Sequence, residues 1–206
     1  MRTAVVVLGV LLVAFAGLAS AQTAPKPEKV AELRMALRDL LVEHIHWSRT
    51  LVLATRAGQL AQAQVAETQA LANARAIGDA VGSFYGKDAG QKFAELFTAH
   101  NRAVKDYMQA TFSGRAAAKK AASDRAVKNA REIDVFLSGA NPNLPQGAVL
   151  NLLGSHWAHH VAQIESAAKR DWAGEARVWH DMRKHILTIA DALAEAIAKQ
   201  FAERLQ

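Results

Sequence analysis

Apolar side chains recur every three or four residues along most of this chain, a spacing typical of one face of an α-helix. Around His44, for example, the same helical face carries Leu37, Leu40, Leu41 and Leu51. No proline occurs between Glu28 and Asn141, and residues that favour helices dominate that stretch. No segment alternates convincingly between apolar and polar residues as a half-buried strand does. We therefore predict an all-α protein.

Segments rich in glycine and proline divide this pattern into six predicted helices. The breaks fall at Gly58, Gly86–Asp88, Ser113–Gly114, Gly139–Pro145 and Asp171–Gly174. The predicted helices cover residues 27–57, 59–85, 88–112, 115–138, 145–170 and 174–205. Because short connections join antiparallel neighbours, we expect a single up-down bundle domain over residues 27–206. Its hairpins span 27–86, 88–140 and 145–206, after a short linker at 22–26.

The three predicted hairpins are copies of one unit. The segment Leu40–His44 recurs as Leu96–His100 and again as Leu152–His156, each time 56 residues further on. The second helices repeat at the same step, where Asn73 corresponds to Asn129 and then to His185. A fixed period of this kind indicates a repeated supersecondary unit. The predicted architecture is therefore a six-helix bundle made of three repeated helical hairpins.

The repeat predicts an internal layer of polar side chains. His44 precedes the turn at Gly58 by about as many residues as Asn73 follows it, so both lie about 21–23 Å from that turn. The apolar neighbours of His44, His100, His156 and His185 at helical spacing place these imidazoles on core-facing sides. If the hairpins pack around a common axis, one ring is expected to contain His44, His100, His156, Asn73, Asn129 and His185.

The third hairpin carries further histidines and a carboxylate near the same level. His160 shares a helical face with His156, and Asp181 lies four residues before His185 on the facing helix. Residues at this spacing on adjoining helices form metal sites in helical bundles. Trp157 lies beside this region and could shield it from solvent.

This constellation is the leading candidate for a binding site, with a divalent transition metal as its ligand. The candidate metal ligands are His44, His100, His156, His185, His160 and Asp181. Residues expected to support them or to set the packing register are Asn73, Asn129, Glu43 and Trp157. Sites rich in imidazole and free of thiolate suit Zn, Cu, Ni or Fe. Non-covalent haem is a minor branch of this hypothesis, since two facing histidines can serve as axial ligands.

Two other functions stay open on the sequence alone. In the first, the protein is a structural or protein-interaction module whose His and Asn layer only sets the packing register among similar helices. In the second, it is an enzyme that uses the histidines as acid–base groups. No nucleophile elbow, HExxH motif or phosphate-binding loop is present. The one Glu-x-x-His pair, Glu43 and His46, lies on a polar helical face, which disfavours a di-iron centre.

The N-terminus predicts export. Residues 1–21 combine a basic start, an apolar run and the small-residue segment Ala19-Ser20-Ala21, as a cleavable signal peptide does. We therefore expect a periplasmic or secreted protein without a stable membrane anchor. The chain has no cysteine, so disulfides and thiolate metal sites are excluded.

The positive charge does not indicate nucleic-acid binding. The formal net charge is +6, and one modest basic cluster comprises Lys119, Lys120, Arg125, Lys128 and Arg131. A nucleic-acid interface would require a dominant basic surface with interleaved aromatic residues, and this cluster lacks both. We interpret it as a solvated helix face.

The segment Glu43-His44-Ile45-His46-Trp47-Ser48-Arg49 resembles the E-H-x-x-W-[ST]-R motif of a group of uncharacterised bacterial all-helical proteins with repeated helical hairpins. The likeness extends from about Leu33 to Phe201 and implies the same helical fold. Ala99 and Ser155 replace the acid that precedes the second and third histidines in that group. The resemblance implies no specific activity. Arg49 could pair with Glu43 or anchor an anion beside Trp47, and of the two we expect a surface salt bridge with Glu43.

Overall fold

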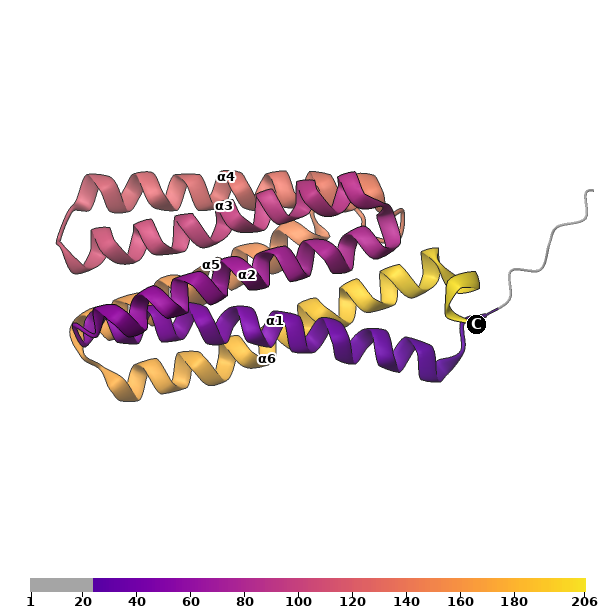
Figure 1. Cartoon of the computed structure of the whole chain (residues 1–206). Helices are drawn as coiled ribbons and strands as arrows, with labels where there is room; N and C mark the ends of the chain where they lie inside the picture. Colours follow the sequence, from indigo (N-terminus) through magenta and orange to yellow (C-terminus); the bar gives the residue numbers. More distant parts are fainter. Residues whose placement is uncertain (1–23) are drawn as a thin grey trace, which may run out of the picture.

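The computed structural model describes residues 24–206, so the predicted signal peptide at residues 1–21 lies outside the described residues. Six α-helices and a final 3₁₀ turn follow in this part of the chain: α1 (Pro27–Arg56), α2 (Leu60–Tyr85), α3 (Lys87–Phe112), α4 (Ala116–Ala140), α5 (Ala148–Lys169), α6 (Trp172–Gln200) and η1 (Ala202–Leu205) (Figure 1). The prediction of an all-α six-helix bundle is confirmed.

The helix boundaries differ from the predicted ones mainly in the third hairpin. Helix α5 begins at Ala148 and not at Pro145, because turns occupy the segment that follows α4. The buried carboxylate of Asp134 holds this segment by accepting hydrogen bonds from the backbone N–H groups of Gly147 and Leu150. The predicted helix 174–205 ends at Gln200 and continues as the separate 3₁₀ turn η1.

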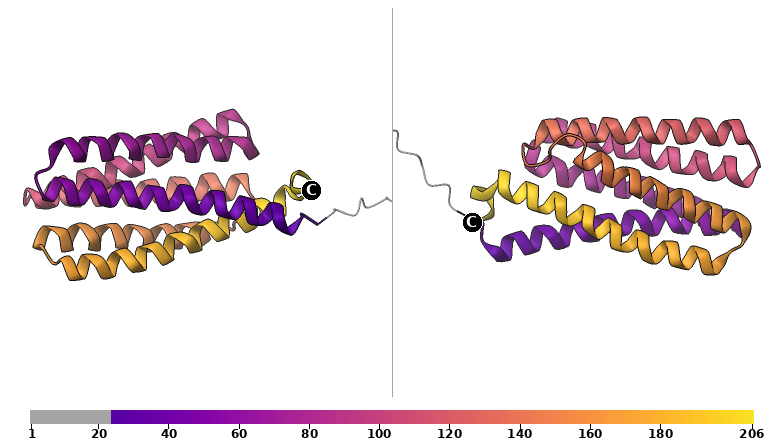
Figure 2. Two further views of the ribbon diagram at one scale, coloured as in Figure 1. Left: turned by 60° about the horizontal axis from the view of Figure 1, so that its bottom comes forward. Right: turned by 180° about the vertical axis from the view of Figure 1, so that it is seen from behind.

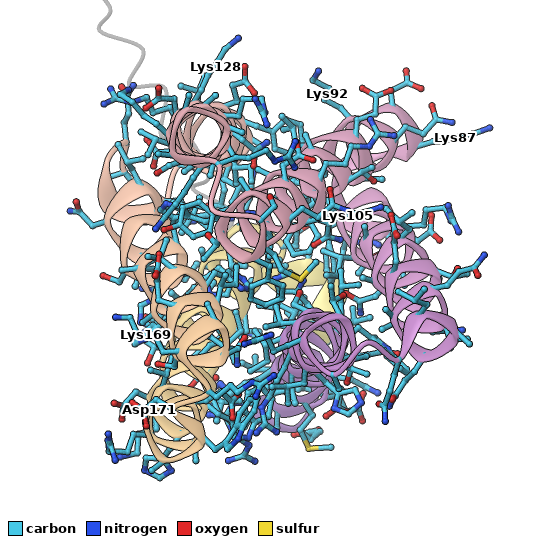
Figure 3. The ribbon with its side chains drawn as sticks, turned by 90° about the vertical axis from the view of Figure 1, so that its left-hand side faces the viewer. Lys87, Lys92, Lys105, Lys128, Lys169 and Asp171 are labelled. Atoms are coloured by element: carbon cyan, nitrogen blue, oxygen red, sulfur yellow. The ribbon has the colours of Figure 1, made fainter. Side chains whose placement is uncertain are left out.

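The helices form a closed ring whose alternate members meet at the centre. Each helix packs against the next one in sequence, and α6 packs against α1 to close the ring. In addition, α1, α3 and α5 contact one another. The first helix of every hairpin therefore lies at the centre of the bundle, and Figure 2 shows the arrangement from two further sides. Seen along the bundle in Figure 3, charged side chains such as Lys87, Lys92 and Lys128 project outward.

The turns inside the three hairpins repeat the 56-residue period in three dimensions. Each turn contains one residue in the left-handed backbone conformation: Gly58 with φ 73°, Gly114 with φ 67° and Arg170 with φ 59°. The residue after each one donates a backbone hydrogen bond of 2.9 Å to the carbonyl five residues earlier. The third turn thus centres on Arg170, at the edge of the predicted break, and Asp171 then caps α6 by accepting from the N–H of Gly174.

The apolar core lies on both sides of the histidine level. One group of buried side chains contains residues that precede the repeated histidines on the central helices, such as Leu37 on α1 and Phe93 on α3. The other contains residues that follow them, such as Val52 on α1 and Val104 on α3. Burial of these side chains is the main favourable contribution to folding. The polar layer therefore lies in the interior between two apolar regions.

Candidate metal centre

Four histidines meet in the middle of the bundle. They are His44 of α1, His100 of α3, and His156 and His160 of α5. One ring nitrogen of each lies within 4.8 Å of the corresponding nitrogens of the other three. Their exposed fractions are 0%, 8%, 3% and 0%, in the same order. Four imidazoles from three helices thus form one compact, solvent-excluded group, which we call the histidine cluster.

The repeat and the helix period together explain this convergence. His44, His100 and His156 occupy the same position of three successive repeats, and their helices are the three that contact one another at the centre. His160 follows His156 by four residues, so it lies one turn further along the same face of α5. The corresponding positions in the other two repeats are occupied by Ser48 and Val104. The fourth imidazole is therefore specific to the third hairpin.

The distances between the nitrogens suit a shared cation better than a hydrogen-bonded network. The Nε2 atom of His156 lies 3.3 Å from Nε2 of His44 and 3.0 Å from Nε2 of His160. A ring nitrogen carries either one proton or one lone pair, so His156 Nε2 cannot make two full hydrogen bonds of this kind. A tetrahedral metal ion bound to nitrogen at about 2.0–2.1 Å holds its ligand nitrogens about 3.3 Å apart. The contacts of His156 with His44 and His160 are close to that value, and all four candidate ligand nitrogens lie within 4.8 Å of one another.

Four ring nitrogens of the cluster have no hydrogen-bond partner among the described residues. Among the described residues, no hydrogen-bond partner is found for the buried Nδ1 atoms of His44, His156 and His160, or for Nε2 of His100. Most buried polar atoms in proteins are hydrogen-bonded, and an unpaired one is costly. An imidazole that binds a metal through Nε2 keeps a proton on Nδ1, so the missing Nδ1 partners are equally costly for a metal site and for a layer that only sets the register. The spacing of the nitrogens is the observation that favours a metal.

Burial keeps the imidazoles neutral. Loss of solvation, reinforced by neighbouring imidazoles, holds the pKa values of His44, His156 and His160 well below their usual value. Burial alone lowers the pKa of His100 to about 4. Neutral imidazole is the form that binds a metal ion. At neutral pH the cluster therefore presents four uncharged nitrogen ligands.

Three members of the expected six-residue ring have a different role. The amide nitrogen of Asn73 donates to the carbonyl of Leu40, and that of Asn129 donates to the carbonyl of Leu96, each at 3.0 Å. His185 Nε2 makes the equivalent contact with the carbonyl of Leu152 at 2.9 Å. Each bond joins the two helices of one hairpin one turn before the central histidine. The expectation that all six side chains converge is therefore wrong, although they do lie near one level.

The structure places two predicted metal ligands outside the histidine cluster. A carbonyl oxygen can only accept a hydrogen bond, so Nε2 of His185 carries the proton, and His185 is not among the four histidines whose ring nitrogens converge. The ring of His185 does stack beside His156, with centroids 6.5 Å apart. Asp181 is exposed on α6 and does not belong to the cluster. Their spacing of four residues correctly places Asp181 and His185 on the same face of α6. It does not show how far that face is turned toward the centre of the bundle.

Glu43 and Trp157 do not support the cluster directly. Glu43 is exposed, and its carboxylate accepts hydrogen bonds from Asn73 Nδ2 at 3.2 Å and from Trp47 Nε1 at 3.1 Å. Trp157 packs edge-on against Tyr107, with ring centroids 5.3 Å apart. Glu43 thus strengthens the first hairpin, while Trp157 belongs to the apolar packing beyond the histidine level.

A partly buried ion pair that sequence reasoning missed joins α1 to α6. Arg49 donates to both carboxylate oxygens of Glu175, at 2.6 and 2.7 Å, and its guanidinium lies 4.9 Å from the ring centroid of Trp179. Gln163, which follows His160 by three residues, also donates to Glu175. The expected pairing of Arg49 with Glu43 is therefore wrong. The partners are 126 residues apart, so no local spacing could have indicated the contact.

The chain matches no protein-family model, no curated protein and no solved structure. The resemblance of residues 43–49 to a bacterial group thus stays an expectation. In the part of the chain that the structure describes, none of the helices has the length and hydrophobicity needed to cross a membrane. The site itself is accordingly the main basis for a functional conclusion.

Proposed function

We propose that this protein binds one transition-metal ion in the histidine cluster. The observation that carries the proposal is the approach of four buried imidazole nitrogens, all within 4.8 Å of one another. Neutral nitrogen ligands without thiolate suit Zn²⁺, Cu²⁺, Ni²⁺ or Fe²⁺. Haem suits the same arrangement poorly, because nitrogens 3.0–3.3 Å apart leave no space for a porphyrin between them.

The geometry supports binding rather than catalysis. A catalytic zinc site keeps one coordination position for water or substrate, whereas a structural site uses four protein ligands. The cluster offers four nitrogens and is almost completely shielded from solvent. We therefore propose a role in holding the ion, for storage, for transfer or for stabilising the bundle. If residues 1–21 direct export as expected, this role belongs outside the cytoplasm.

The test is a metal titration of protein purified without an affinity tag and stripped with a chelator. Zn²⁺, Cu²⁺ and Ni²⁺ are added separately, and stoichiometry and melting temperature are measured. One ion per chain should bind and raise the unfolding free energy by RT ln(1 + [L]/Kd), about 2.7 kcal/mol at a hundredfold excess over Kd. His160→Leu leaves three ligands and should weaken this effect, whereas His46→Leu, which changes an exposed histidine on α1, should leave it unchanged.

His160→Leu also distinguishes the metal proposal from the alternative in which the His and Asn layer only sets the packing register. Removing the His160 imidazole, whose Nδ1 is buried without a partner, should leave the metal-free protein folded, with unchanged or higher stability. A purely architectural layer predicts the reverse: no stabilisation by any of the three ions, and a loss of stability in His160→Leu. That pair of results would overturn the metal proposal.

A further inference from the structure

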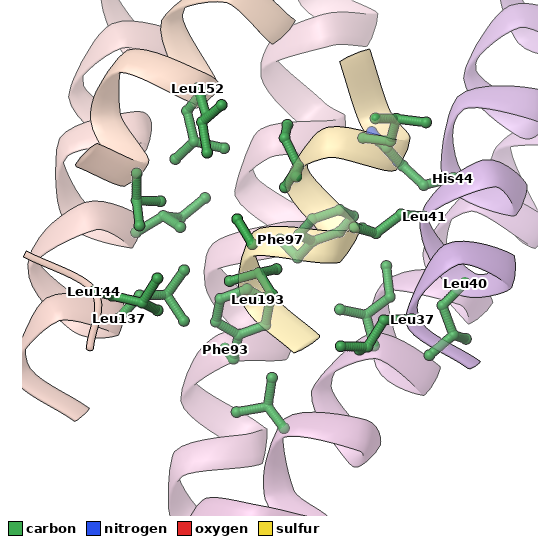
Figure 4. Close-up of a pocket in the computed structure, with 18 of the residues that line it drawn as sticks. Leu37, Leu40, Leu41, His44, Phe93, Phe97, Leu137, Leu144, Leu152 and Leu193 are labelled. Carbon is green, nitrogen blue, oxygen red and sulfur yellow. The ribbon is translucent and has the colours of Figure 1, made fainter. Parts of the chain in front are cut away.

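An apolar cavity lies directly beside the histidine cluster. It has a volume of about 70 Å³ and is lined by side chains from all six helices. Figure 4 shows Leu41, Phe97 and Leu152 around it, with His44 at one edge. His156 also lines the cavity. The cavity therefore borders two of the proposed metal ligands without being part of the metal site.

The wall of this cavity offers almost nothing that could hold water. An internal water molecule requires two to four polar partners. Apart from His44 and His156, the only lining residue with a polar side chain is Tyr85. The Tyr85 hydroxyl is already engaged, since it donates to Gln200 and accepts from Asn141. The Nε2 atoms of the two histidines face each other at 3.3 Å, and their Nδ1 atoms are the only side-chain polar atoms of lining residues that have no partner among the described residues. The remaining lining side chains are aliphatic or aromatic hydrocarbons.

Cavities of this character stay dry and take up apolar molecules. An engineered cavity of about 150 Å³ with similar walls binds benzene or xenon. The cavity beside the histidine cluster has about half that volume, which suits an occupant of one to three heavy atoms. We propose that it is a binding site for one small apolar molecule of the size of a diatomic gas. The occupant would lie against His44 and His156, and its binding requires no metal ion.

Xenon is a suitable probe, because it is apolar and of this size. Metal-free protein with ¹³C-labelled methyl groups is titrated with xenon and followed by NMR. Saturable shifts are expected at the methyl groups of Leu41, Leu153 and Ile189, which line the cavity. Ala192→Leu places three additional carbons in the cavity and should abolish these shifts. Ala158→Leu makes the same change at an exposed position of α5 and should leave them intact.

A second variant covers the case in which Ala192→Leu does not fold. Leu153→Ala enlarges the cavity toward the volume that holds benzene, so this variant should bind benzene while the native protein does not. Shifts that rise linearly with xenon pressure, or that persist in folded Ala192→Leu, would show that no specific site exists. Since no metal is present, these outcomes are independent of the test of the metal proposal.

Discussion

At the scale of single residues, the same side chain has two different roles in this protein. His156 places Nε2 among the other imidazoles, whereas His185 uses the same atom to bind the Leu152 carbonyl. In doing so, His185 replaces the amide that Asn73 and Asn129 supply in the other hairpins. The role of a histidine here therefore depends on its position in the repeat. At one position it is a candidate metal ligand, and at the other it forms a hydrogen bond between two helices.

This equivalence predicts the effect of substitutions at His185. His185→Asn should retain the interhelical hydrogen bond and change the unfolding free energy by well under about 1 kcal/mol, whereas His185→Ala removes the donor and should cost about 1 kcal/mol. Chemical denaturation of the two variants and the native protein provides the comparison. Equal losses in both variants would show that the contact with Leu152 does not stabilise the third hairpin.

At the scale of helices, α2 and α3 approach each other through glycines. A methyl group on Gly90 would lie 2.7 Å from the carbonyl oxygen of Gly78 and 2.8 Å from Cα of Gly82. Both are backbone atoms of α2, which cannot move without shifting the helix. This contact explains glycine at a position inside a helix, where it otherwise lowers stability. It also helps to hold the first hairpin against the second.

Gly90→Ala should therefore destabilise the protein by about 1–3 kcal/mol through overpacking. Gly154 provides the matched control, because it lies inside α5 with no atom within 4 Å of an added methyl group. Gly154→Ala should stabilise the protein by up to about 1 kcal/mol, owing to the higher helix propensity of alanine. Thermal denaturation measures both effects. Stabilisation by Gly90→Ala would contradict the close approach of α2 and α3.

At the scale of the whole molecule, the buried imidazoles make the stability of the metal-free protein depend on pH. The unfolded chain takes up protons at histidines near pH 6.5, whereas the folded state resists protonation because burial lowers their pKa values. As the pH falls below 6.5, the unfolded state therefore binds more protons, and stability decreases. Above this pH both states are neutral at these positions, so the full stability is present.

For His100 alone, a pKa of about 4 in the folded state implies a loss of about 2 kcal/mol between about pH 7 and pH 5. The other three histidines of the cluster add to this loss. Denaturation at about pH 7, 6 and 5 measures it and stays above the range in which paired carboxylates such as Asp191 and Glu165 titrate. His160→Leu should reduce the slope. Equal stability at the two ends of this range would contradict a neutral buried cluster.

Much of the fold was predictable from local pattern. Hydrophobic spacing and the positions of Gly58 and Gly114 located the first four helices to within a few residues. The predicted start at Pro145 was wrong, because the segment before α5 is held by the distant carboxylate of Asp134. The left-handed conformation of Arg170 in the third turn could not be predicted either, because arginine, unlike glycine, gives no indication of a positive φ. Boundaries that depend on tertiary contacts or on unusual turn residues carry no local signal.

By itself, the sequence determined the helices, the 56-residue repeat and the common level of His44, His100 and His156. A helix has a constant rise and period, so the height and face of each side chain follow from counting residues. Only the tertiary structure decided that His160 joins these three, that His185 and Asp181 do not, and that an apolar cavity lies beside them. The reason is that the rotation and separation of neighbouring helices depend on how all their side chains pack together.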